Sequence, residues 1–170
     1  MAMRISGIWR NEDGSALLEG TVLMPFLMTL ILGTLDYSFF FYQQHLVAGG
    51  VRDAARYLAR TSNPSSSTSQ TTAQNLATTG SPTGGSYRRV NGFDPGNVAI
   101  SISYVGNALN ATTHLRAYRE APPECGGPDQ IAIINVTGSF PYASFGFLTY
   151  LGLSSPTVSV THSERCIGLS

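Results

Sequence analysis

The chain has 170 residues, enough for one domain with an attached segment, and only 12% of them are charged. Ten arginines balance ten acidic residues and there is no lysine, so no basic surface is available for nucleic-acid phosphates and no nucleic-acid partner is expected. A hydrophobic content of 42% beside abundant Ser, Thr and Gly is more typical of an anchored protein outside the cytoplasm than of a cytosolic enzyme.

A polar leader, residues 1–14, precedes a long apolar run. Between residues 16 and 42 this run carries charge only at Glu19 and Asp36. Its uncharged part, residues 20–35, would be about 24 Å long as a helix, so the flanking apolar residues are needed to cross a hydrocarbon core of roughly 30 Å. Because no Ala-x-Ala cleavage site follows, we predict a membrane-spanning helix rather than a conventional secretory signal peptide.

The helix is predicted to continue beyond the membrane as an amphipathic stem, so that residues 15–60 form one element. The apolar stripe of the stem recurs at helical spacing in Val47, Val51, Ala54 and Leu58. A solvated stripe of arginines lies at Arg52, Arg56 and Arg60. Asp53 is placed to pair with Arg56, and Gly49-Gly50 is a candidate bend.

Residues 61–86 are rich in Ser, Thr, Asn and Gly, and Asn63-Pro64 is expected to end the stem helix. We interpret this segment as a Ser/Thr-rich linker, with a short helix over residues 70–77 as the alternative. From residue 87 the period changes from 3.6 to 2, which predicts a sheet domain over residues 87–170.

Three strands are predicted in that domain, beginning near Val98, Ile131 and Thr157, and a weaker fourth covers residues 115–119. The fold class is therefore α+β, a long N-terminal helix followed by a small antiparallel sheet of three or four strands. The apolar stretch 140–153 is too short to cross a bilayer as a helix. We expect it to form core beneath the sheet, with a membrane-surface or partner-facing patch as the alternative.

The two cysteines, Cys125 and Cys166, both lie in the C-terminal half. Outside a reducing cytosol they most simply form a disulfide, which would close a loop of about 40 residues and contribute roughly 4 kcal/mol. Two buried unpaired thiols, or a zinc site that joins His162 to Cys166, are the alternatives. The sequence has no catalytic motif and no CxxC pair, so no catalytic residue, cofactor or metal is predicted.

The stretch GSALLEGTVLMPFLMTLILGTLDYS resembles the N-terminal segment of TadE-like proteins, minor pseudopilins of the tight-adherence (Tad or Flp-type) pilus system. Gly14, Glu19, Pro25 and the pair Asp36-Tyr37 carry the resemblance. The stem sequence VRDAARYLAR is similar to the family's Ala/Arg-rich stem. Gly20 departs from the aromatic residue that processed members usually carry after the glutamate.

The resemblance implies that prepilin peptidase cuts between Gly14 and Ser15, leaving Glu19 as the fifth residue of the mature chain. It also implies that Glu19 attracts the new α-amine of a neighbouring subunit, since a carboxylate at low dielectric is costly unless it is paired. The alternative is that Glu19 lies at the headgroup level beside the positive helix N-terminus. The implied partners are the membrane, other pilins and pseudopilins, prepilin peptidase and the inner-membrane assembly platform.

Pro25 and Asp36 are the other candidate assembly residues. Pro25 can kink the helix and so tune its packing, while Asp36 either lies at the periplasmic membrane edge or pairs with a partner helix. Arginines flank both sides of the span, so the positive-inside rule does not decide orientation. The cysteines favour a cytoplasmic N-terminus with a periplasmic C-terminal domain.

The function indicated is a non-enzymatic, single-pass inner-membrane pseudopilin that takes part in pilus assembly or initiation. The competing hypothesis is a membrane-tethered periplasmic binding or sensing module, in which the span is only an anchor. A tether needs no cleavage site, so the unit from Gly14 to Glu19 discriminates between the two.

Overall fold

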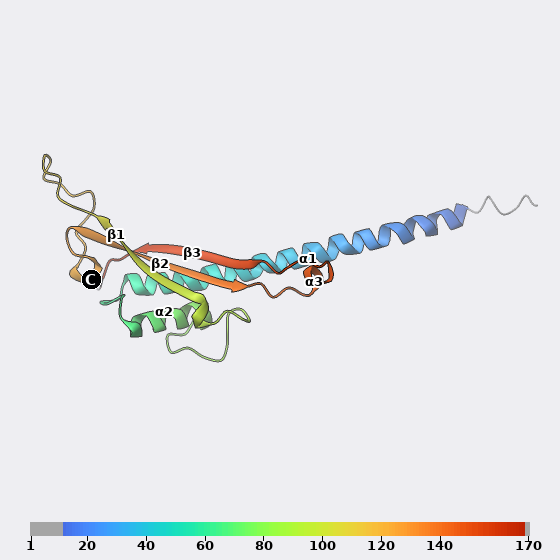
Figure 1. Ribbon diagram of the computed structural model, residues 1–170, viewed down its shortest axis with the longest axis horizontal. Coiled ribbons are helices and arrows are strands. Elements are labelled where there is room, and N and C mark those ends of the chain that lie inside the picture. Colours follow the sequence, from blue (N-terminus) through green and yellow to red (C-terminus); the bar gives the residue numbers. More distant parts are fainter. Residues whose placement is uncertain (1–11, 169–170) are drawn as a thin grey trace, which may run out of the picture.

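One long helix organises the chain, of which the computed structural model describes residues 12–168. Helix α1 (Glu12–Ala59) is 48 residues long, and its N-terminal half projects from the sheet domain as a rod (Figure 1). The other elements are α2 (Ser67–Thr79), the 3-10 turn η1 (Pro95–Asn97), β1 (Val98–Gly106), the 3-10 turn η2 (Pro123–Cys125), β2 (Gln130–Pro141), α3 (Phe147–Tyr150) and β3 (Thr157–Arg165). The predicted α+β class is confirmed.

The stem of α1 buries the predicted apolar stripe. Its four members, Val47, Val51, Ala54 and Leu58, are completely buried, and the arginine stripe on the opposite face is exposed. The predicted pairing of Asp53 with Arg56 is wrong, because Asp53 accepts a hydrogen bond from Arg89 at 2.8 Å instead. Arg56 lies 3.8 Å from Glu164 of β3. Both stem charges therefore pair with later parts of the chain.

Gly49 and Gly50 do not interrupt α1, which continues to Ala59. Gly50 lies against α2, where an added Cβ would collide with the backbone carbonyl oxygen of Ala77. A Cβ at Gly49 would meet only the Arg89 guanidinium, at 3.8 Å. Gly50 thus allows α2 to approach the stem closely.

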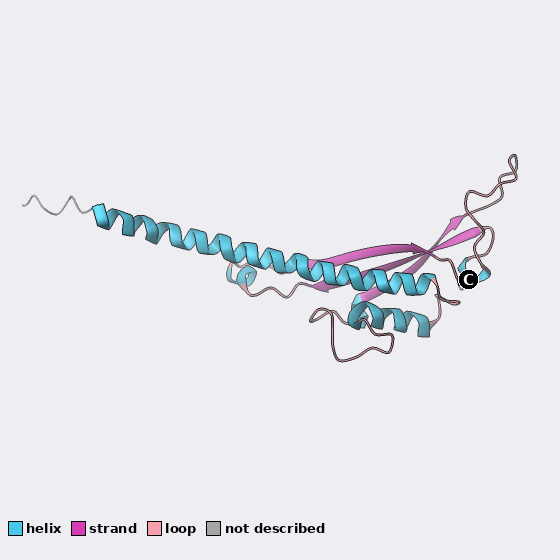
Figure 2. Cartoon of the chain, turned by 180° about the vertical axis from the view of Figure 1, so that it is seen from behind, coloured by secondary structure: helices cyan, strands magenta, loops and turns pink. Residues whose placement is uncertain are grey.

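The Ser/Thr-rich segment contains helix α2 and is not a flexible linker. Ser66 caps the helix by accepting a hydrogen bond from the Ser69 amide, and Gly80 ends it in the left-handed conformation at φ 77°. Ala73 and Ala77 are completely buried, and α2 lies beside the C-terminal end of α1 (Figure 2). Small side chains that permit close packing offset the low helix propensity of Ser and Thr.

The sheet is antiparallel with strand order β1-β2-β3, so β2 is the central strand. Alternate residues of β2 face the stem and are buried: Ala132, Ile134, Val136, Gly138 and Phe140. A Cβ at Gly138 would lie 2.9 Å from the Phe93 ring and 3.0 Å from Val51, so glycine permits close contact between sheet and stem. Three strands were predicted correctly, but residues 115–119 form no strand.

Candidate functional site

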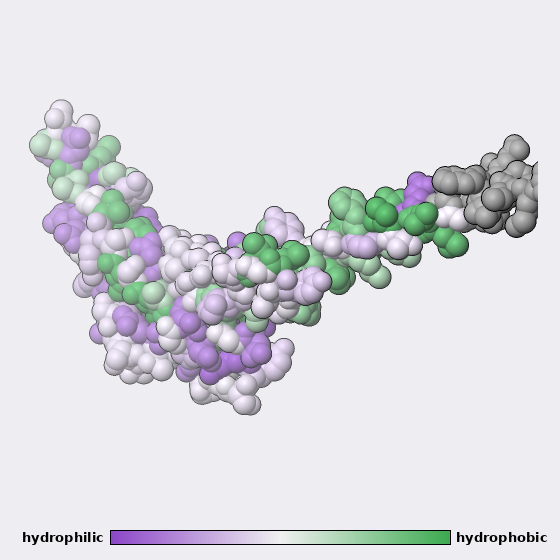
Figure 3. Space-filling model, turned by 45° about the vertical axis from the view of Figure 1, so that its right-hand side comes forward, coloured by the Kyte–Doolittle hydropathy of each residue, from purple (hydrophilic) through white to green (hydrophobic). Residues whose placement is uncertain are grey.

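The N-terminal half of α1 is an apolar helix that the rest of the described chain leaves uncovered. Leu17 is 74% exposed and Leu32 is still 47% exposed, whereas the apolar stripe of the stem is completely buried from Val47. This helix is long and apolar enough to span a membrane. Apolar side chains occupy much of the face of the rod that Figure 3 shows, and they gather again where the rod meets the domain. An aqueous environment is unsuitable for such a surface, and a bilayer or a neighbouring helix suits it.

Glu19 lies on this exposed part of α1. Within residues 12–168 it forms no ion pair, so its predicted partner is not in the same described chain. Gly14 lies in the first turn of α1, where backbone N–H groups have no intrahelical acceptor. Most of the predicted leader, and the side chain of Ser15, lie outside the described residues.

Pro25 lies inside α1, and the helix runs through it without a break. Polar groups nearby are satisfied within the helix. Four hydroxyls donate to the carbonyl oxygen four residues earlier at 2.7–2.8 Å: Thr21, Thr29, Thr34 and Ser38. The acceptor for Thr29 is the carbonyl of Pro25. Internal satisfaction of this kind is what a helix surrounded by lipid requires.

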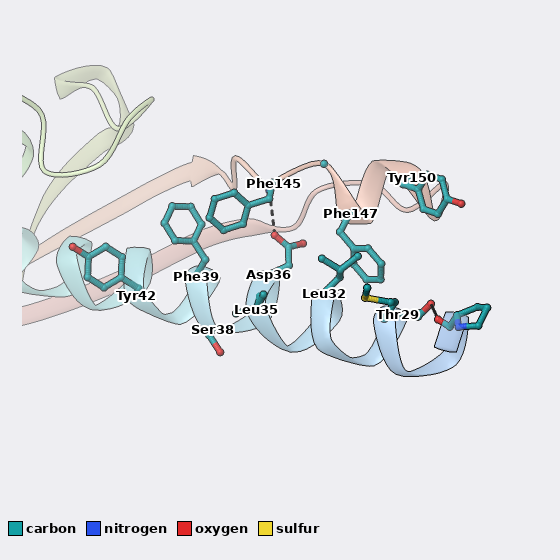
Figure 4. A pocket seen from close by; sticks show the side chains of 13 residues that line it. Thr29, Leu32, Leu35, Asp36, Ser38, Phe39, Tyr42, Phe145, Phe147 and Tyr150 are labelled. Atoms are coloured by element: carbon teal, nitrogen blue, oxygen red, sulfur yellow. Dashed lines mark hydrogen bonds between the residues drawn. The ribbon is translucent and has the colours of Figure 1, made fainter. Parts of the chain in front are cut away.

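Asp36 is the one charged residue that the structure buries, at 4% exposure. The Tyr142 hydroxyl donates to Asp36 Oδ1 at 2.7 Å and to its backbone oxygen at 2.8 Å. The Phe145 amide donates to the same Oδ1 at 3.2 Å, the contact drawn in Figure 4. The sequence left the partner of Asp36 open between a membrane edge and a second helix, and in the structure the partner is this chain's own β2–β3 connection.

Tyr142 gains from this contact as well. Its side chain is 3% exposed, and its ring lies edge-on to Phe40 with the centroids 5.3 Å apart. Burial, and then the hydrogen bond and the negative charge of Asp36, raise the pKa of Tyr142 well above its ordinary value of 10.0. The hydroxyl therefore stays protonated and remains a donor to the carboxylate.

The connection between β2 and β3, residues 142–156, is named here the α3 loop. It turns back along α1 toward the N-terminal rod, and the Phe147 ring lies 3.4 Å from the position of a Cβ on Gly33. Figure 4 shows Phe147 beside Leu32 and places Tyr150 farther toward Thr29. Between α1 and the α3 loop lies an open, mostly apolar groove of about 1030 Å³.

The expectation that residues 140–153 form core beneath the sheet is correct only for the first part. Phe140 and Tyr142 are buried. Beyond them the segment leaves the sheet, and four of its apolar side chains are exposed: Phe145 at 70%, Tyr150 at 86%, Leu151 at 47% and Leu153 at 56%. The segment therefore combines a short core part with an outward-facing apolar surface.

A disulfide lies beside the C-terminal end of α1, where the Ile167 amide donates to the Ala59 carbonyl. Cys125 in η2 is bonded to Cys166 just after β3, as predicted, and both are buried. Because both sulfurs are used, the alternative of a zinc site at Cys166 is wrong. Nearby, the Arg116 guanidinium donates to Asp129 at 2.7 Å, and this hydrogen bond is the main cause of a raised pKa at Arg116.

These features divide α1 into an exposed apolar rod, a contact zone at Asp36 and a covered stem. The sequence model of the TadE-like protein family matches residues 14–56, which include all three zones. The chain carries a TadE-like segment. The TadE-like match ends before α2 and the sheet, and no curated protein and no solved structure matches the chain. The sheet domain therefore extends beyond what the family comparison describes.

The sequence identified one side of the contact zone and missed the other. Asp36 was recognised from its position in an apolar run, but Tyr142, Phe145 and Phe147 were not recognised as its surroundings. A usable signal existed in residues 140–153, where five aromatic residues occur among residues without charge. Such a run is too aromatic and too long for the end of an ordinary strand.

Proposed function

We propose that this chain is a minor pseudopilin that takes part in the assembly or initiation of a Tad/Flp-type pilus. In this proposal it is a single-pass protein of the inner membrane, with a cytoplasmic N-terminus and a periplasmic sheet domain. Its partners are other pilins and pseudopilins, prepilin peptidase and the inner-membrane assembly platform. The proposal assigns the chain no catalytic step.

The observation that carries the proposal is the contrast between the two halves of α1. The apolar stripe of the stem is covered by the sheet and α2, whereas the part from Leu17 to Leu32 is exposed over about 23 Å. An exposed apolar helix of this kind is stable in a bilayer. During assembly, the helices of other subunits can replace the lipid that contacts it. The TadE-like match to residues 14–56 supports this reading.

The disulfide supports the assigned orientation. Cys125 and Cys166 are bonded beside the C-terminal end of α1, where the Ile167 amide donates to the Ala59 carbonyl, and such bonds persist in the periplasm and not in a reducing cytosol. A single span then leaves the N-terminus in the cytoplasm. The N-terminal end of α1 would there face the cytoplasmic side of the assembly platform.

The proposed role of Glu19 follows from its exposure and its lack of a partner in the described chain. Cleavage after Gly14 would create a positively charged amine on Ser15, four residues before Glu19. A neighbouring subunit displaced along the axis by about 6 Å would bring its amine level with Glu19. Pairing of the two charges at low dielectric would favour that one axial register between subunits.

The cleavage step is tested by the intact mass of the protein in the presence and absence of prepilin peptidase. We expect the mature chain to begin at Ser15 only when the peptidase is present. Gly14→Leu should block cleavage, because a side chain would then fill the position next to the scissile bond. Gly20→Leu is the matched control, since neither glycine has any atom within 4 Å of an added Cβ.

An unchanged N-terminus in both strains would contradict the pseudopilin assignment and favour the membrane-tethered binding or sensing module. Cleavage that continues in Gly14→Leu would show that a different peptidase, acting elsewhere, processes the chain.

A further inference from the structure

We propose that the α3 loop inserts into the periplasmic face of the bilayer beside α1, so that lipid covers its exposed aromatic and aliphatic side chains. The chain would then contact the membrane twice, through the helix and through this loop. The inference rests on the membrane-spanning helix and on the proposed periplasmic side of the sheet domain, and it does not depend on a role in pili.

The first support is the composition of the loop. Residues 142–156 contain no charged side chain, yet Phe145, Tyr150, Leu151 and Leu153 are 47–86% exposed. This apolar surface is continuous with the exposed apolar surface of the rod, because both line the same groove. Aromatic residues at the level where a helix leaves the bilayer are typical of a membrane interface.

The second support is the position of the loop along α1. Its side chains reach down beside Gly33 and line a groove that extends to Thr29 and Pro25. From Gly14 to Thr29 α1 is only about 22 Å long, which is less than the roughly 30 Å of a hydrocarbon core. A span long enough to cross the membrane must therefore include the part of α1 against which the loop is packed.

The third support is that the turn and the base of the loop are held by hydrogen bonds within the chain. Four amides at its turn donate to carbonyls of the loop at 2.9–3.1 Å: Tyr150, Leu151, Gly152 and Leu153. At its base the Tyr142 amide donates to the Pro156 carbonyl at 2.9 Å. The Phe145 amide and the Tyr142 hydroxyl are used by Asp36. Backbone at this depth is tolerated only when its polar groups have such partners.

Asp36 then has a specific purpose at the membrane edge. It lies about 26 Å along the helix from Glu19, near the outer limit of the hydrocarbon core if Glu19 lies at the inner one. A bare carboxylate at that depth would be costly. The α3 loop supplies both donors to the Asp36 carboxylate, the Tyr142 hydroxyl and the Phe145 amide. The rings of Phe39 and Phe145, whose centroids are 4.4 Å apart, shield the carboxylate from lipid.

The test uses tryptophan fluorescence of the full chain in phosphatidylcholine vesicles whose acyl chains carry bromine as a quencher. The single native tryptophan, Trp9, is replaced by Phe in every variant. Tyr150→Trp reports on the loop, and Leu35→Trp in α1 is the reference inside the bilayer. Tyr87→Trp is the matched control, since Tyr87 is 80% exposed like Tyr150 but lies on the segment between α2 and β1.

We expect Tyr150→Trp to be quenched as strongly as Leu35→Trp, with emission shifted to shorter wavelength relative to Tyr87→Trp. Leu153→Trp, at a second exposed position of the loop, should behave like Tyr150→Trp. If both loop variants emit and quench like Tyr87→Trp while Leu35→Trp is quenched, the loop lies in water and the proposal is wrong. It would then be a surface for another protein.

Discussion

Replacing Tyr142 by Phe should weaken the contact that fixes the sheet domain to the outer end of the rod. The phenol donates at 2.7 Å to a carboxylate that is 4% exposed, so solvent screens the contact little. A hydrogen bond to a charged group contributes about 1.5–3 kcal/mol. We expect the free energy of unfolding of the domain to fall by that amount, measured by urea denaturation of the full chain in detergent micelles with circular dichroism.

A double-mutant cycle isolates the pair. In the Asp36→Ala background the Tyr142 hydroxyl can still donate to the backbone oxygen of residue 36, at 2.8 Å in the native chain, so Tyr142→Phe should then cost only about 0.5–1.5 kcal/mol. The coupling energy expected between Asp36 and Tyr142 is therefore about 1–2 kcal/mol. Tyr87→Phe, at an 80% exposed tyrosine, is the control and should change stability by less than about 0.5 kcal/mol.

Strict additivity of the two substitutions, or a Tyr142→Phe effect as small as that of Tyr87→Phe, would refute this account of the contact. Asp36 would then be a residue of the membrane edge whose neighbours are incidental.

Gly50→Ala should destabilise the domain by about 1–3 kcal/mol in the same denaturation assay, because its methyl group overlaps the α2 backbone, whereas Gly49→Ala should be neutral or stabilising by up to about 1 kcal/mol; equal effects would contradict the assigned packing. Reduction of the Cys125–Cys166 bond, or Cys125→Ser with Cys166→Ser, should cost roughly 4 kcal/mol for a sequence separation of 41, and freshly isolated protein should carry no thiol that labels without reductant. Because the pKa of Tyr142 is raised in the folded state, its contribution to stability should be complete below pH 10.0 and lost as pH rises beyond it. Urea midpoints measured against pH should therefore fall less steeply at alkaline pH in Tyr142→Phe than in the native chain.

The elements with a strong period were predictable from the sequence. The stem stripe from Val47 to Leu58 was assigned correctly because helical spacing alone decides which side chains share a face. The three strands were found because alternation and flanking glycines and prolines mark them locally. Apolar residues on both faces at the start of β2 are typical of a central strand, which is its place in the sheet.

The contacts that complete the site were not predictable in this way, because they join residues far apart in the chain. Tyr142 and Asp36 are 106 residues apart, and no local pattern indicates that a strand connection returns to the rod. Gly50 looked like a weak point because its propensity is poor, yet its value comes from the approach of α2. Helix α2 is a similar case. Its Ser and Thr residues indicated a linker, and only its packing on the stem explains why it is a helix.

The central claim, that the rod assembles with other subunits through Glu19, is tested most directly by surface piliation of Glu19→Ala. Each variant is expressed in a strain that lacks the native copy, and protein levels in the membrane fraction are matched. The account predicts that Glu19→Ala inserts normally but loses pili, that Glu19→Gln behaves like it, and that Glu19→Asp, which keeps the charge with a shorter reach, is intermediate. Normal piliation by Glu19→Ala at normal protein levels would contradict the claim and leave Glu19 as a bystander at the headgroup level.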